Sequence, residues 1–296
     1  MIKKAIFLIC IIMLTASSSY AVDISSPHAM LINPDTMEVL FERNADERVP
    51  MASITKVMTL TVVGDLLDNE QLALDDYVTV SHRAVGTEGA TVSVVAGERL
   101  TVLDCIKAVA LPSANDAAIV LAEGAAGSEK NFVALMNDKT EMLGLDDTQF
   151  ANCHGLDAQG HYSTANDIAL MSMVLLRNEA ISPILAMKSA YIRNGKEKIY
   201  STNELLDGYD GLVGIKTGTT SKAGNCLSTS ATRNKITLIA VVLGCPTSKQ
   251  RFEEAEKLLD YGFGLYDKKI TDDWFMKLMV YRGQFVPLVN AQHRYR

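Results

Sequence analysis

Residues 51–67 read MASITKVMTLTVVGDLL, and this stretch decides how the rest of the chain must be arranged. We predict a helix here with apolar side chains on almost every side, which places it in the middle of a domain. Ser53 and Lys56 lie three residues apart near its start. They therefore share one helix face, one turn apart.

This pair can supply a nucleophile and its base. A serine hydroxyl is a weak nucleophile until a base takes its proton, and a lysine is that base only if burial or a nearby positive charge lowers its pKa. Lys56 in an apolar helix fits this requirement, and the Ser53 N–H at the helix start suits an oxyanion. The alternative is a helix-capping serine beside a surface lysine, which the pattern alone favours because it is common by chance.

A second candidate motif is Ser113-Ala114-Asn115, on a predicted loop between two helices. A serine and an asparagine two apart on an extended loop point the same way. They could serve as a proton relay and as an amide that orients a substrate carbonyl. Asn115 could instead be only a helix N-cap. Ser201-Thr202-Asn203 has the same pattern without the helix–loop–helix setting.

The third motif, Lys216-Thr217-Gly218, ends a predicted strand that begins at Leu212. Glycine lets a ligand approach the strand backbone closely. The lysine and threonine then offer a cation and a hydroxyl to a terminal carboxylate. Alone, the motif would also fit an exposed edge strand tipped with lysine.

Strands are predicted near both ends of the chain, with helices between them. The expected strands are 30–33, 38–43, 212–216, 226–232 and 236–244. Residues 72–176 follow mostly helical patterns, with helix caps expected at Thr101, Asn115 and Ser128 and a further helix from near Thr164. The fold class is α+β: one antiparallel sheet flanked by helices, with an inserted all-helical subdomain at about 68–178.

Together the motifs resemble those of the D-alanyl-D-alanine carboxypeptidases, a family of low-molecular-weight penicillin-binding proteins. SxxK and KTG each occur once, and the order SxxK, SxN, KTG matches that family, with Ala114 where the common form has aspartate. The similarity extends to residues 48–59, 111–118, 154–157 and 161–165, and covers about Ile24 to Tyr266. It implies a β-lactamase/transpeptidase-like fold, with the D,D-peptidase domain at 22–269.

The resemblance also implies a division of labour in a serine-type D-Ala-D-Ala carboxypeptidase. Ser53 would attack the carbonyl of the penultimate D-alanine, and Lys56 would take the proton, with Lys216 helping to depress its pKa. Ser113 would deliver a proton to the departing D-alanine. Penicillins would acylate Ser53 by the same route, and no metal or cofactor is expected. The implied substrate-binding residues are Asn115, Lys216, Thr217, Gly218 and Thr219. The backbone N–H groups of Thr219 and Ser53 would form the oxyanion hole.

Residues 1–21 are predicted to be a signal peptide. Lys3 and Lys4 precede an apolar run from Ile6 to Leu14 that is too short to span a bilayer, and Ser19-Tyr20-Ala21 fits a cleavage site. An uncleaved N-terminal anchor is the alternative. The expected location is outside the cytoplasm, either periplasmic or extracellular at the cell wall.

The rest of the sequence argues against other partners. The net charge of −7 becomes −9 without Lys3 and Lys4 (−7 minus two), and an acidic chain without a basic stripe excludes nucleic-acid binding. No clear membrane anchor is expected in the mature chain. Residues 270–296 are expected to be a short tail, with strands at 278–281 and 285–289, resembling the start of a missing C-terminal β domain. Sparse cysteines favour buried thiols over bridges: Cys105, Cys153, Cys226 and Cys245.

Three other activities stay open. A D,D-endopeptidase that cuts peptidoglycan cross-links would use the same residues. A β-lactamase would need a carboxylate for its deacylating water, and no ExxLN-like segment follows the second motif. A non-catalytic penicillin- or wall-binding module would not need the full set of reactive side chains. His154 and His161 are interpreted as structural, and residues 200–203 lack the arginine that some relatives use to hold the carboxylate.

Overall fold

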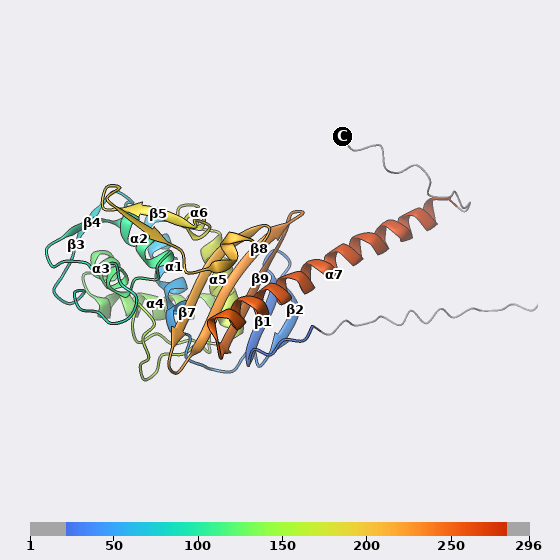
Figure 1. Ribbon diagram of the computed structural model, residues 1–296, viewed down its shortest axis with the longest axis horizontal. Helices are drawn as coiled ribbons and strands as arrows, with labels where there is room; N and C mark the ends of the chain where they lie inside the picture. Colours follow the sequence, from blue (N-terminus) through green and yellow to red (C-terminus); the bar gives the residue numbers. More distant parts are fainter. Residues whose placement is uncertain (1–21, 283–296) are drawn as a thin grey trace, which may run out of the picture.

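The computed structural model describes the backbone of residues 22–282 and the side chains of residues 22–269. Strands from both ends of this part of the chain form one five-stranded antiparallel sheet, as predicted, in the order β2-β1-β9-β8-β7. The strands are β1 (His28–Asn33), β2 (Glu38–Arg43), β7 (Leu212–Thr220), β8 (Gly224–Arg233) and β9 (Ile236–Cys245). Because β7 lies at an edge, its outer side can face something other than a strand (Figure 1).

Helices cover both faces of the sheet. The predicted buried helix is α1 (Lys56–Asp68), which packs with α5 (Ala165–Leu176) on one face, while α7 (Ser248–Arg282) runs along the other face and extends past it (Figure 1). The central strand β9 alternates between the two cores, as expected for a strand buried on both sides. Its residues divide into Ile239, Val241 and Leu243 toward α5, and Leu238, Ala240 and Val242 toward α7.

A mostly helical part is inserted between β2 and β7, as predicted. Its elements include β3 (Tyr77–Thr79), β4 (Arg99–Thr101), α2 (Val102–Ala110), α3 (Asn115–Ala126) and α4 (Glu129–Leu143). The predicted caps Thr101 and Ser128 are confirmed, since each side chain accepts a hydrogen bond from a backbone N–H three residues on. The expectation of an all-helical insertion is wrong for residues 77–101, where a two-stranded ribbon encloses an irregular loop, 80–98.

A second small ribbon connects this helical part to the sheet. The segment contains α6 (Ser182–Leu185), the hairpin strands β5 (Ser189–Ile192) and β6 (Glu197–Tyr200), and a 3₁₀ turn η2 (Glu204–Asp207). The hairpin packs on α2, and the chain then enters β7. Within this segment, α6 contacts both α2 and β7, the strand that carries the third motif.

The C-terminal prediction needs a correction. Residues 278–281 were expected to form a strand, but α7 continues through them to Arg282. A four-residue apolar run fits either period, so its pattern alone cannot separate strand from helix. The second expected strand, 285–289, and the predicted signal peptide, 1–21, lie outside the described residues. Within the described part of the chain, no helix is both long and apolar enough to cross a membrane.

Candidate active site

Ser53 lies in a tight turn directly before α1. Residues Ala52–Thr55 form a 3₁₀ turn, η1, so the α-helix begins only at Lys56 and not at residue 51 as expected. Ala52 has a φ of +50°, which is uncommon for a residue with a side chain. A Cβ on Gly155 would lie 2.1 Å from the carbonyl oxygen of Ala52. The strained turn is therefore held by a loop that can approach it only because residue 155 is glycine.

Lys56 is fully buried and points back at Ser53. Its Nζ lies 2.9 Å from Ser53 Oγ, 2.6 Å from Asn115 Oδ1 and 2.5 Å from the carbonyl oxygen of His154. Burial lowers the pKa of Lys56 to about 7, because the charged form loses its hydration. The surface-lysine alternative is wrong for this chain.

The three contacts around Nζ decide what a neutral Lys56 can do. The Asn115 amide oxygen and the His154 carbonyl oxygen can only accept hydrogen bonds. A neutral amine has two N–H groups and one lone pair, so both N–H groups are taken by these two oxygens. The lone pair is then left for the hydroxyl proton of Ser53. The geometry thus suits proton removal from Ser53 Oγ.

The second motif lies at the turn between α2 and α3. The N-cap prediction for Asn115 is wrong, since α3 begins at Asn115 itself and Ala114 occupies the cap position. Its side chain instead accepts from Lys56 and donates from Nδ2 to the Glu88 carbonyl at 2.7 Å. Ser113 is buried with a φ of +66°, and its hydroxyl has no hydrogen-bond partner among the described residues. A strained residue with a buried, unpaired hydroxyl is typical of a functional site.

The third motif brings β7 onto the nucleophile. A Cβ on Gly218 would lie 2.9 Å from the backbone nitrogen of Ser53, so only glycine lets the strand pass this closely. The strand continues to Thr220, so the motif lies inside β7 and not at its end as predicted. Thr217 is buried, and its hydroxyl lies 2.6 Å from that of Thr202. Thr219 is the exposed residue of this stretch.

Lys216 is also buried, with only 1% of its surface exposed, so the exposed-edge alternative is wrong as well. Its Nζ donates to the Thr217 carbonyl at 3.1 Å. Burial, and then the positive charges of Lys56 and Arg251, hold the pKa of Lys216 well below its usual range. Burial is the main cause of the lowered pKa of Lys56.

Arg251 is a cation that the sequence analysis missed. It comes from the first turns of α7 and lies against the back of β7, where its NH1 donates to the Gly218 carbonyl at 3.2 Å and to Thr219 Oγ1 at 3.0 Å. It is 7% exposed, and its Nε has no partner among the described residues. Nothing in the residues near Arg251 signals this role, because only the return of α7 across the sheet brings them together.

His154 and His161 have structural contacts, as interpreted from the sequence. His161 Nε2 lies 2.7 Å from Thr55 Oγ1, and its Nδ1 accepts from the Ala151 N–H at 3.0 Å. Burial lowers the pKa of His154 to about 3 and that of His161 to about 4, so both are neutral near pH 7. The one contribution that the sequence did not reveal is the His154 backbone carbonyl, which binds Lys56.

The described residues contain no cluster of three or more histidine, cysteine or acidic side chains that could hold a metal ion. The four described cysteines are buried and unpaired: Cys105, Cys153, Cys226 and Cys245. The reactive groups of the site are therefore a serine hydroxyl, two buried amines and a second serine hydroxyl, backed by an arginine. Such a set has the groups that acyl transfer through a serine with a lysine base requires.

Comparison with known proteins agrees with this chemistry. A family model described as D-alanyl-D-alanine carboxypeptidase matches residues 14–247, and the chain belongs to this family. DacF of Bacillus subtilis, a D-alanyl-D-alanine carboxypeptidase, is 39% identical over 242 residues, which are 81% of this chain and 62% of DacF. DacC of Escherichia coli, also a D-alanyl-D-alanine carboxypeptidase, is 40% identical over 242 residues, which are 78% of this chain and 59% of DacC. The chain thus spans about three fifths of these relatives.

Solved structures agree on the fold. Penicillin binding protein 5 of Haemophilus influenzae has a TM-score of 0.78 and 35% identity, covering 82% of this chain and 72% of that one. Penicillin-Binding Protein D2 of Listeria monocytogenes, in its ampicillin-bound form, has a TM-score of 0.74 and 31% identity, covering 81% of this chain and 98% of that one. The predicted transpeptidase-like α+β fold is confirmed.

Proposed function

We propose that this protein is a serine-type D-Ala-D-Ala carboxypeptidase that removes the terminal D-alanine from peptidoglycan stem peptides. The observation that carries the proposal is the Ser53–Lys56 pair, with 2.9 Å between Oγ and Nζ and a pKa of about 7 on the buried amine. A base with a pKa near the working pH is the most effective one for proton transfer. The family of the chain supports the choice of substrate.

Acylation follows from the positions of these groups. Ser53 Oγ attacks the carbonyl carbon of the penultimate D-alanine while its proton passes to Lys56 Nζ. The backbone N–H groups of Ser53 and Thr219 bind the oxyanion that forms. When the peptide bond breaks, the proton moves from Lys56 through the Ser113 hydroxyl to the departing amine. The unpaired state of that hydroxyl leaves it free for this relay.

The carboxylate of the departing D-alanine needs a cationic seat. Lys216 and Thr217 on β7 offer an amine and a hydroxyl to this carboxylate. Arg251 adds a positive charge from behind the strand. Residues 200–203 lack the arginine that some relatives use to hold the carboxylate. Arg251 fills that gap from α7. Asn115, which binds Lys56, holds the acyl chain from the opposite side.

Hydrolysis completes the cycle. Lys56 is neutral again once the proton has left on D-alanine, so it takes a proton from water, which attacks the ester, and returns that proton to Ser53 Oγ. Penicillins would acylate Ser53 in the same way. The ampicillin- and cefotaxime-bound forms of the Listeria protein support this for the present chain. The acidic chain would act after export, at the cell wall.

The test is release of free D-alanine from a pentapeptide that ends in D-Ala-D-Ala, with wild-type protein and Ser53→Ala. We expect release by the wild type and none by the variant. No release by folded wild-type protein would overturn the proposal. Cleavage of a cross-linked dimer would then indicate a D,D-endopeptidase, and penicillin binding without any cleavage would indicate a binding module.

A further inference from the structure

The turn of the β5–β6 hairpin contains an arginine in an unusual backbone conformation. Arg193 and Asn194 both have a φ of +55°. These two left-handed positions suit asparagine or glycine, whereas arginine is uncommon there. A residue held in such a conformation directs attention to what its side chain does.

The Arg193 side chain binds the irregular loop 80–98. Its guanidinium binds both carboxylate oxygens of Glu98, at 2.7 and 3.2 Å, and donates to the Val92 carbonyl at 3.0 Å. It also pairs with Glu197 across the hairpin. The Arg193 and Glu98 side chains are only 20% and 22% exposed, so this bidentate pair is well shielded. An isolated exposed ion pair would carry far less weight.

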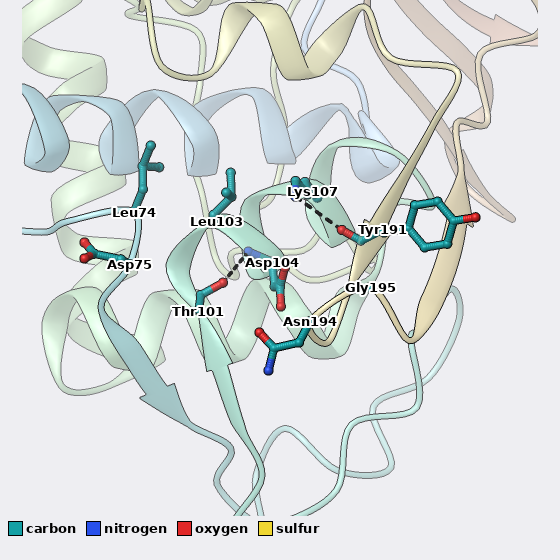
Figure 2. A pocket seen from close by; sticks show the side chains of 9 residues that line it. All are labelled: Leu74, Asp75, Thr101, Leu103, Asp104, Lys107, Tyr191, Asn194 and Gly195. Atoms are coloured by element: carbon teal, nitrogen blue, oxygen red, sulfur yellow. Dashed lines mark hydrogen bonds between the residues drawn. The ribbon is translucent and has the colours of Figure 1, made fainter.

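The hairpin itself is fastened to α2. The backbone N–H of Arg193 donates to Asp104 Oδ2 at 2.9 Å, and Lys107 Nζ donates to the Tyr191 carbonyl at 3.2 Å. Figure 2 shows the contact between Lys107 and Tyr191, with Asp104 and the turn residue Asn194 lining the same pocket. The guanidinium therefore projects from a fixed base.

The loop that Arg193 grips is the one that holds Asn115. The Ala90 carbonyl accepts the Asn115 backbone N–H at 2.7 Å, and the Glu88 carbonyl accepts its Nδ2 at 2.7 Å. Val92 is fixed on both sides, since its N–H binds the Asp116 carboxylate at 3.1 Å and its carbonyl binds Arg193. Arg193 is thus linked to Asn115 through the backbone of residues 88–92 and its hydrogen bonds, and Asn115 Oδ1 in turn binds Lys56.

The other end of the hairpin leads to the opposite wall of the site. Directly after β6, Thr202 donates its N–H to the Leu111 carbonyl, two residues before Ser113, and its hydroxyl bonds to that of Thr217. The hairpin therefore bridges the loop side and the strand side of the active site. Its turn fixes Asn115 while its base contacts the third motif.

We propose that Arg193 is a positioning residue for acylation: by fastening loop 80–98 it holds Asn115 against Lys56. This inference rests on the proposed function. Without the hydrogen bonds from Arg193 to the loop, the loop and Asn115 should shift. Lys56 would then be aligned with Ser53 for less of the time. Misplacement of this kind slows chemistry by about 10- to 100-fold.

The test compares Arg193→Met with Arg193→Lys and with a matched control, Arg233→Met. Arg233 is a similarly shielded arginine, 27% exposed, that pairs with Asp210 and Asp260 at the far end of β8. The second-order rate of acylation by a fluorescent penicillin and the melting temperature are measured for each. We expect acylation to slow about 10- to 100-fold in Arg193→Met and less in Arg193→Lys, which can pair with Glu98 but lacks the fork. Arg233→Met should stay within twofold of wild type at a comparable loss of melting temperature.

A double-mutant cycle separates positioning from general destabilisation. If Arg193 acts through Asn115, adding Arg193→Met to Asn115→Ala should slow acylation little further. The inference would be overturned if the double variant lost the full product of the two single-variant losses in acylation rate. It would also be overturned if Arg193→Met were acylated at the same rate as Arg233→Met. If Arg193→Met does not fold, Glu98→Gln replaces it as the test, because it weakens the same contact. Acylation by Glu98→Gln must then be slower than in the wild type, by a smaller factor than that expected for Arg193→Met. Failure of wild-type acylation would instead contradict the proposed function.

Discussion

The protonation state of Lys56 should govern the rate at which Ser53 is acylated. Only the neutral amine can accept the hydroxyl proton, and burial lowers its pKa to about 7. The rate should therefore follow the neutral fraction of Lys56, which is about 9% at pH 6, about 50% at pH 7 and about 91% at pH 8. Acylation should rise about tenfold between pH 6 and pH 8 and then level off.

The perturbation that isolates this group is Lys56→Arg. A guanidinium keeps its proton at every accessible pH, with a pKa above 12, so its neutral fraction at pH 8 is below about one in ten thousand. The variant should lose at least about 1,000-fold in acylation rate and should show no plateau. His154 and His161 should not contribute to the dependence of the acylation rate on pH, because their pKa values of about 3 and about 4 lie below the pH range of the assay.

The assay is the second-order rate of acylation by a fluorescent penicillin between pH 5.5 and 9.5, below saturation, with circular dichroism at each pH to check folding. An ordinary lysine would give a rate that climbs tenfold per pH unit without levelling before pH 10. That outcome would refute the lowered pKa. A flat profile, or an active Lys56→Arg enzyme, would refute the role of Lys56 as the base.

Three further outcomes are expected. Gly218→Ala should slow acylation about 100-fold, because the new Cβ would lie 2.9 Å from the Ser53 nitrogen, whereas Gly208→Ala, with nothing within 4 Å of its Cβ, should not change the rate. Arg251→Met should lower kcat/KM about tenfold for a peptide with a free terminal carboxylate but not for its amide, since it removes a charge behind Gly218; equal losses on both would contradict the carboxylate role. Lys56→Met should raise the free energy of unfolding at pH 7 by about 2 kcal/mol, measured by urea unfolding. In the wild type, the drop in the pKa of Lys56 from 10.5 to about 7 on folding costs about 4 kcal/mol of stability at this pH. The variant avoids this cost but leaves two hydrogen-bond acceptors unpaired, which offsets about half of the gain. The gain should shrink as the pH rises from 7 to 10.5, since the wild type recovers stability as the unfolded chain also loses this proton.

Much of the fold was predictable because its signals are local. The strands at both ends, the buried helix at 56–68 and the caps at Thr101 and Ser128 follow from periodicity and short-range hydrogen bonding. The errors lie where local patterns are ambiguous or silent. The run at 278–281 fits a helix as well as a strand, and loop 80–98 is ordered by Asp116 and Arg193, from later elements.

The candidate site divides in the same way. Ser53, Lys56, Ser113 and Lys216 could be named because their spacing carries the chemistry. Arg251 could not, since its place beside β7 depends on how α7 returns across the sheet. The His154 carbonyl is a backbone atom, so no residue type reveals it.

Local rules fail most clearly at the reacting groups themselves. Ala52 and Ser113 have positive φ values, the Ser113 hydroxyl is unpaired, and two lysines are buried without a carboxylate as hydrogen-bond partner. Each of these features costs stability. All of them lie where η1, the α2–α3 turn and β7 meet, while the cores on both faces of the sheet follow the expected patterns. The sheet and α1 therefore stabilise a strained junction, and that junction is where we propose that Ser53 loses its proton near neutral pH.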